Sequence, residues 1–157
     1  MQSEGFSISD LEQFASRFYG GRPLLLVPYA YNTTFTALTA GQTQTATVNI
    51  TANADFILLT FHHRSSTNLA SAQTVSTKNA PYVRMVVTDS GTNEQFTNAA
   101  VDLENYSTNG NIINQLPYPR IISGRSTLTL QVSNYDTSNT IASLDIFMEG
   151  VLVRAYT

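Results

Sequence analysis

Cysteine and tryptophan are absent from this chain of 157 residues, and lysine occurs once, as Lys78. Without cysteine the chain can hold neither a disulfide nor a thiolate metal site. Charged residues make up 12% of the chain, about half of the roughly 25% that is usual for soluble domains. The seven arginines are dispersed along the sequence, so no basic patch for binding nucleic acid is present.

Long apolar runs are missing as well. The longest run near the N-terminus covers residues 24–27 and is far too short to span a bilayer. Residues 1–10 contain no basic region followed by an apolar one, so they do not read as a secretory signal. We therefore expect no membrane partner and a protein that is made in the cytoplasm.

Threonine, asparagine, serine and glutamine take the place of the missing charge, at roughly a third of the chain. These residue types suit strands and turns. A surface of uncharged polar groups also costs less to desolvate than a charged one. The composition therefore predicts an outer surface that neighbouring protein subunits cover.

Residues 9–19 are predicted to form one short amphipathic helix. Ser9 and Glu12 have capping-box spacing, Leu11, Phe14 and Phe18 recur at helical spacing, and two glycines follow. So short a helix is marginal in water. We expect its Phe14 and Phe18 face to dock, either on its own domain or on a neighbouring subunit.

The rest of the chain alternates with the period of two that is typical of strands, between turns rich in Gly, Asn, Ser and Pro. This pattern predicts an all-β fold, an antiparallel two-sheet sandwich of jelly-roll type at residues 23–157, preceded by an N-terminal arm at 1–22. A bulge is expected near Gly150. The predicted strands are 24–27, 33–38, 43–50, 56–61, 82–88, 99–103, 120–122, 127–132 and 141–153, with long loops at 64–81 and 105–119.

Side chains suited to catalysis or metal binding are few. His62 and His63 are adjacent, so on a strand they point to opposite faces, and no nearby Asp or Glu completes a ligand set. Asp102 and Glu104 share a face if residues 101–105 form a strand, and they could then bind calcium together with loop carbonyls. A calcium loop needs a denser run of oxygen ligands, so we expect a solvated or salt-bridged edge instead. No phosphate loop, nucleophile elbow or zinc-helix motif occurs. We expect no enzyme, no metal and no cofactor.

Tyrosine, phenylalanine and arginine are the side chains that most often anchor protein interfaces. Arg84 lies in an apolar strand, where we expect either an interface or an ion pair with Asp145, Asp102 or Glu149. The candidate interface residues are Phe14, Arg17, Phe18, Tyr29, Tyr31, Tyr106, Tyr118, Arg120 and Arg125.

A family resemblance is carried by the order of strands and turns across about two thirds of the chain, in residues 54–58, 86–91, 98–103, 116–120, 126–134 and 144–150. This order resembles small structural proteins of tailed bacteriophages, including the cement or decoration proteins of the capsid. The resemblance implies a virion protein, a dimer or trimer that lies across joints between major capsid subunits. It implies no catalytic residues and does not cover residues 1–22.

Three functions stay open at this point. The first is a capsid cement or decoration protein that bridges and stabilises major capsid subunits. The second is a tail, neck or baseplate component of the same virion, which needs the same kind of sandwich with an arm. The third is a sugar- or receptor-binding jelly roll, in which tyrosine would replace the missing tryptophan as a stacking platform.

Overall fold

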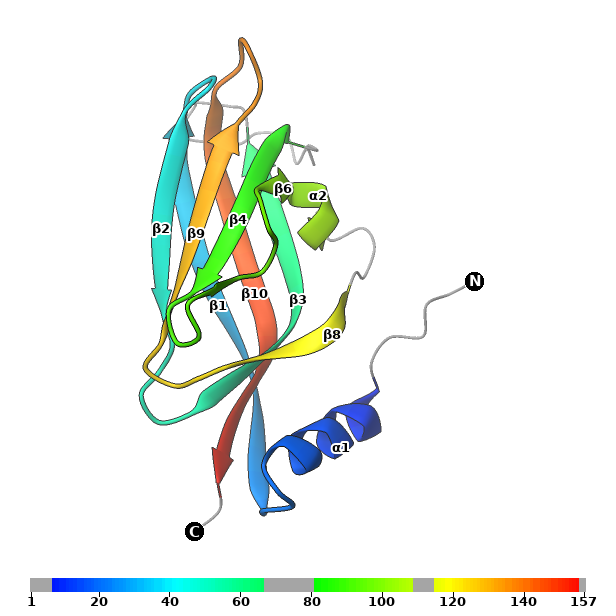
Figure 1. Ribbon diagram of the computed structural model, residues 1–157. Helices are drawn as coiled ribbons and strands as arrows, with labels where there is room; N and C mark the ends of the chain where they lie inside the picture. Colours follow the sequence, from blue (N-terminus) through cyan, green and yellow to red (C-terminus); the bar gives the residue numbers. More distant parts are fainter. Residues whose placement is uncertain (1–6, 67–80, 109–114, 156–157) are drawn as a thin grey trace.

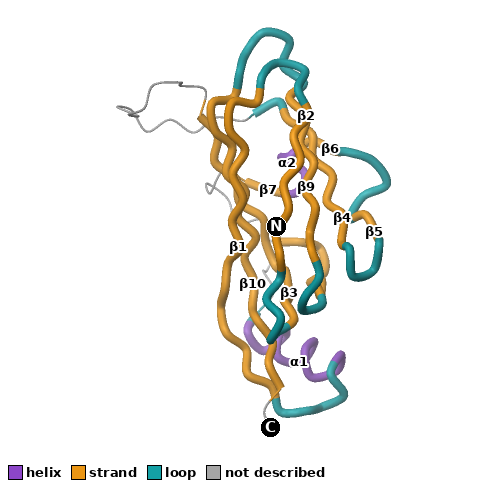
Figure 2. Tube along the Cα trace, turned by 90° about the vertical axis from the view of Figure 1, so that its left-hand side faces the viewer, coloured by secondary structure: helices purple, strands orange, loops and turns teal. Residues whose placement is uncertain are grey.

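Two β-sheets stacked face to face form the body of the protein, as the edge-on view in Figure 2 shows. The computed structural model describes residues 7–66, 81–108 and 115–155. The first sheet contains β1 (Leu24–Leu38), β10 (Ile141–Ala155), β3 (Asp55–Ser66), β8 (Gln115–Ile122) and the short β7 (Ser107–Thr108). The second contains β2 (Thr43–Asn49), β9 (Thr127–Asn134), β4 (Val83–Asp89) and the short β5 (Glu94–Gln95) and β6 (Val101–Asp102).

The strand pairing is that of a jelly roll. Working inward from the two ends of the chain, β1 pairs with β10, β2 with β9, and β3 with β8, all antiparallel. This nested hairpin is then rolled up, so that β10 also pairs with β3 and β9 with β4. Among the strands that the structure describes, β7 alone departs from the antiparallel arrangement, because it pairs parallel with β3. The predicted all-β two-sheet sandwich is confirmed.

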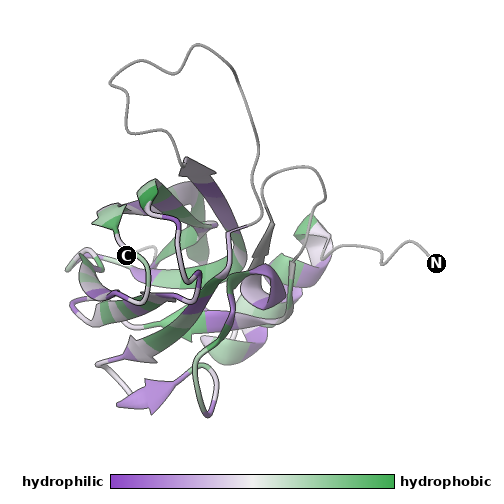
Figure 3. Cartoon of the chain, turned by 90° about the horizontal axis from the view of Figure 1, so that it is seen from above, coloured by the Kyte–Doolittle hydropathy of each residue, from purple (hydrophilic) through white to green (hydrophobic). Residues whose placement is uncertain are grey.

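The main core lies between the two sheets, because every second side chain of each long strand points inward. β4 alternates strictly between buried and half-buried positions, and β9 follows the same period. Figure 3 shows hydrophobic colouring along strands in the middle of the molecule. Fully buried members of this core include Phe56, Phe61, Met85, Leu130, Leu144 and Ile146.

A second, smaller core lies under helix α1 (Ile8–Phe18), which packs on the outer face of the first sheet near its lower end (Figure 1). Leu11 and Ala15 of the helix are buried there against Ile57, Val151 and Val153. The helix therefore docks on its own domain. The surface it covers also explains why β3 and β10 are apolar on both faces at this end.

Two details of the predicted helix were wrong. The N-cap is Ser7, because its Oγ accepts from the backbone N–H of Asp10 at 3.1 Å while the Asp10 carboxylate accepts from the Ser7 N–H at 3.2 Å. The reciprocal pair starts the helix at Ile8, ahead of the predicted Ser9 cap. Phe18 also does not dock, since its side chain is 61% exposed.

Most strand predictions are confirmed, with four corrections. The separate strands 24–27 and 33–38 are one strand, β1, because an edge strand tolerates Pro28. The strand 99–103 shrinks to β6, since Leu103 begins the short helix α2 (Leu103–Tyr106). The strand 120–122 lengthens to β8, and the loop predicted at 64–81 starts later because β3 runs to Ser66. Residues 67–80 and 109–114 of the predicted loops lie outside the described residues.

Candidate functional site

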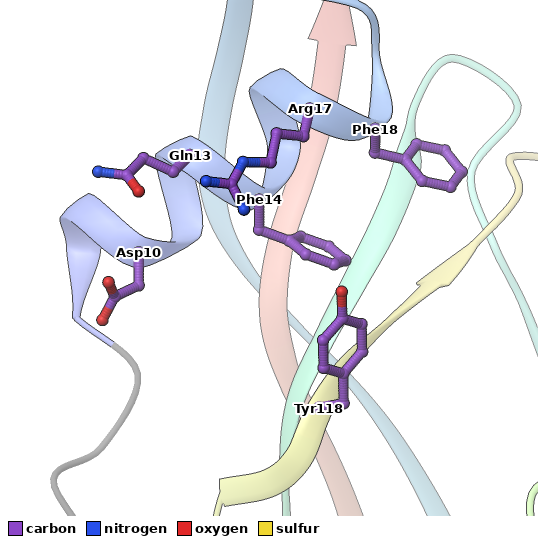
Figure 4. Close-up of a pocket in the computed structure, with 6 residues that line it drawn as sticks. All are labelled: Asp10, Gln13, Phe14, Arg17, Phe18 and Tyr118. Carbon is purple, nitrogen blue, oxygen red and sulfur yellow. The ribbon is translucent and has the colours of Figure 1, made fainter.

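Helix α1, which packs on the outer face of the first sheet, lies beside strand β8 of that sheet, and a hollow remains between them (Figure 4). The hollow has a volume of about 470 Å³. Its aromatic centre is the contact between Phe14 and Tyr118, whose rings meet edge to face at 5.3 Å between centroids. The lining side chains are Asp10, Gln13, Phe14, Arg17, Phe18 and Tyr118.

The helical period decides which residues of α1 reach this hollow. Because Leu11 and Ala15 point into the sheet, positions 10, 13, 14 and 17 share the flank that faces β8 and solvent. The 69% exposed ring of Tyr118 projects from β8 towards the same flank. Two segments far apart in the sequence therefore build one surface.

A wider hollow of about 800 Å³ continues beyond Phe14, Phe18 and Tyr118, which line both spaces. Its far side includes Phe96, Tyr106 and Arg120. We call the two hollows together the α1–β8 groove. Large exposed apolar side chains at a concave surface are typical of a binding site for another molecule.

Arg120 is held in the groove by two contacts. Its guanidinium lies 4.0 Å from the centroid of the Phe96 ring, and its Nη2 is 3.4 Å from Oε2 of Glu94. A stacked and paired arginine presents a planar, fixed edge. Such an arginine suits a contact surface because little conformational entropy remains to be lost on binding.

The end of α1 is tied to the sandwich through Tyr19, whose hydroxyl donates to Oδ2 of Asp55 at 2.7 Å. Burial, and then the hydrogen bond to Asp55, raises the pKa of Tyr19 well above its usual value. The other oxygen, Oδ1 of Asp55, accepts from the backbone N–H of Gly124 at 2.8 Å. One carboxylate thus joins α1, β3 and the β8–β9 turn, which holds this wall of the groove in place.

The structure brings together six of the nine candidate interface residues. Phe14, Arg17, Phe18, Tyr106, Tyr118 and Arg120 all line the α1–β8 groove, although Tyr106 is buried. The helical spacing of the sequence alone would have added Asp10 and Gln13 to this set. Nothing local in the sequence indicates Phe96, which directly follows β5 and lines the groove from there.

The other three candidates lie elsewhere. Tyr29 is 47% exposed on the edge strand β1. Tyr31 is half-buried, because its ring packs on Phe56 and its hydroxyl accepts from the Thr51 N–H at 3.1 Å. Arg125 occupies the β8–β9 turn with a φ of 69°. Arg84 pairs with Asp102, one of the three predicted partners, at 3.4 Å and stacks on the ring of Tyr135.

The histidine pair is split between two faces, as predicted, with His63 buried and His62 half-buried. Each of the two histidines nevertheless contacts one carboxylate. Nε2 of His63 is 3.0 Å from Oε1 of Glu104, and Nε2 of His62 is 3.4 Å from Oε2 of Glu149. Burial lowers the pKa of His63, and the nearby Glu104 opposes that shift.

Asp102 and Glu104 do not act as a pair, because the chain turns from β6 into α2 between them. Asp102 contacts Arg84, whereas Glu104 contacts His63. In the part of the chain that the structure describes, no three His, Asp or Glu side chains gather in a way that would hold a metal ion.

Comparisons with known proteins give no relative. The chain matches no known protein family, no curated protein and no solved structure. Across residues 7–66, 81–108 and 115–155, no helix is long and apolar enough to cross a membrane. The fold and the α1–β8 groove are therefore the observations on which a functional conclusion depends.

Proposed function

We propose that this chain is a structural protein of a virion, of the capsid cement or decoration type, which binds major capsid subunits and stabilises the shell mechanically. The observation that carries this proposal is the α1–β8 groove, where Phe18 and Tyr118 are exposed beside Arg17 and Arg120. Aromatic and arginine side chains in a concave surface are the usual anchors of protein contacts.

The outer face of the second sheet supports the proposal. Thr43 and Ser133 join their hydroxyls at 2.7 Å, and Thr127 donates to Asn49 at 3.0 Å, so these polar groups are already paired with one another. Such a face loses little free energy when another surface covers it. Its side chains on β2 and β9 are Thr43, Thr45, Thr47, Asn49, Thr127, Thr129, Gln131 and Ser133.

A shell also lowers the affinity that each contact needs. Copies that bind a repeated lattice at two or more points gain from the high effective concentration of the second site. Modest contacts by the groove and by the uncharged sheet face would then suffice. Because each single contact can be weak, a surface with few charges is sufficient for a protein of an assembled particle.

The test is to purify particles from bacteria that produce this chain and to count its copies per particle. Hundreds of copies are expected for a decoration protein, while six or twelve copies would place the chain in the tail, neck or baseplate. Tyr118→Ser is expected to lower the bound copies several-fold, whereas Tyr29→Ser, the matched change at an exposed tyrosine outside the groove, is expected to leave them unchanged. Absence of the chain from every particle would overturn the proposal.

A sugar-binding role is the second candidate, because the exposed ring of Tyr118 lies beside hydrogen-bonding side chains of Asp10, Gln13 and Arg17. A sugar ring that stacks on an aromatic side chain and bonds to such neighbours is a common arrangement. A glycan array distinguishes the two candidates. Binding that Tyr118→Ser abolishes would favour the sugar-binding role, and an array without hits would remove it.

A further inference from the structure

The flank of α1 that faces the groove carries a charge pattern that is complementary to itself. Asp10 lies in the first turn and Arg17 in the last turn. Seven residues separate them, so they lie on the same side of the helix, about 10 Å apart along its axis. Gln13 lies between them on the same flank, as Figure 4 shows.

Neither charge is used in an ion pair within the described part of the chain. Asp10 accepts hydrogen bonds from Ser7 through Oδ2 alone, which leaves Oδ1 for another donor. The same bonds hold the pKa of Asp10 below its usual value, so the carboxylate is charged at neutral pH. Arg17 is exposed at the other end of the flank.

We propose that a second copy of this chain covers the α1 side of the groove, with its α1 packed antiparallel against the first α1 about a two-fold axis beside Gln13. The proposal rests on the proposed function, and it leaves the part of the groove around Arg120 for the major capsid subunits. In this arrangement Asp10 of each copy faces Arg17 of the other, so one two-fold axis forms two identical ion pairs. Antiparallel helices also place opposite ends of their dipoles together.

The exposed aromatic rings supply the apolar part of this contact. Phe18 is 61% exposed and Tyr118 is 69% exposed, and both border the hollows of about 470 and 800 Å³ beside the helix. Two packed helices lie about 8–10 Å apart, a spacing that the side chains of Asp10 and Arg17 can bridge. The hollows give the side chains of the second copy space on the β8 side of the helix.

Charge exchange tests the arrangement directly, with sedimentation equilibrium of the full chain as the measurement. Arg17→Glu places Asp10 opposite a second acid, and Asp10→Lys places Arg17 opposite a second base, so each variant alone is expected to weaken the dimer by about ten-fold or more. An equimolar mixture of the two variants forms both ion pairs again across a heterodimer. The mixture is expected to regain most of the wild-type affinity.

A second measurement does not depend on the helix cap that Asp10 contributes to. The chain has no cysteine, so Gln13→Cys introduces a single thiol next to the proposed axis. A short bis-maleimide reagent is expected to join two copies of this variant rapidly. Thr47→Cys, on the exposed outer face of the second sheet, serves as the control and is expected to give little cross-linked product.

A chain that stays monomeric at high concentration, a dimer that Arg17→Glu leaves unchanged, or a mixture that regains nothing would each overturn the two-fold contact. Equal cross-linking at positions 13 and 47 would do so as well. These results are independent of the copy number on particles. The two-fold contact and the virion role can therefore fail separately.

Discussion

Gly150 of β10 lies so close to Ile57 of β3 that a β-carbon at position 150 would be 1.9 Å from the Ile57 carbonyl oxygen. The strands slip by one residue between Glu149 and Gly150, and the chains approach each other at this bulge. The bulge that the sequence predicts near Gly150 is thus confirmed. Only glycine fits, because the obstructing atom belongs to the backbone and cannot rotate away.

Gly150→Ala is therefore expected to destabilise the fold by about 2–3 kcal/mol, as an overpacked site does. The free energy of unfolding in urea measures the effect. Glu149→Ala, at the neighbouring exposed position, is the control and is expected to change stability by less than about 0.5 kcal/mol. Equal effects of the two substitutions would contradict the close approach.

The position of the helix cap gives a second prediction. Ser7→Ala is expected to cost about 1 kcal/mol, because it removes the acceptor for the Asp10 N–H. Ser9→Ala is expected to be close to neutral, since Ser9 is exposed inside the helix. Urea unfolding and the amide exchange rates of α1 separate the two serines, and a larger effect at Ser9 would restore the cap expected from the sequence.

The two faces of α1 differ in what they contribute to folding. Leu11→Ala is expected to destabilise the protein by about 2–3 kcal/mol, because its buried side chain packs against Ile57 and Val151. Phe18→Ala removes a larger side chain that is 61% exposed, so its cost is expected to stay below about 1 kcal/mol. Thermal unfolding of the two variants gives the comparison. A large loss at Phe18 would mean that its ring supports the fold rather than a contact surface.

Buried His63 makes stability depend on pH. Burial lowers the pKa of His63 in the folded state, so the unfolded chain binds the proton more readily, and stability is lost as the pH falls below the ordinary histidine pKa of 6.5. Titration of this one group can change the free energy of unfolding by no more than about 1.4 kcal/mol per pH unit. Urea unfolding between pH 8 and 5 is the measurement, with the His63 ring followed by NMR.

The same pH titration of the Glu104→Gln variant tests the contribution of Glu104 to the pKa of His63. Glu104 favours the charged imidazole, so its loss is expected to lower the pKa of His63 further and to deepen the loss of stability in acid. His62, half-buried beside Glu149, serves as the internal comparison in the same NMR spectra. A His63 that titrates above 6.5 in the folded chain would reverse the expected direction.

Much of the fold could be predicted from the local pattern of apolar and polar residues. The period of two in 43–50, 127–132 and 141–153 predicted three strands that the structure contains. Side chains on a strand alternate whatever the strand later pairs with, so this signal survives without tertiary information. The predicted strand bounds were less accurate where a proline interrupted the pattern, as at Pro28, and where a short helix begins, as at Leu103.

The sequence by itself therefore determined the strand content, the presence of the N-terminal helix and the scarcity of charge, because each depends on residue type and local spacing. Only the tertiary structure decided that Glu104 meets His63 and that Phe14 meets Tyr118. Both contacts join segments far apart in the chain. They exist because rolling the sheet and docking α1 bury the most apolar surface in one particular register, and no local pattern records which register that is.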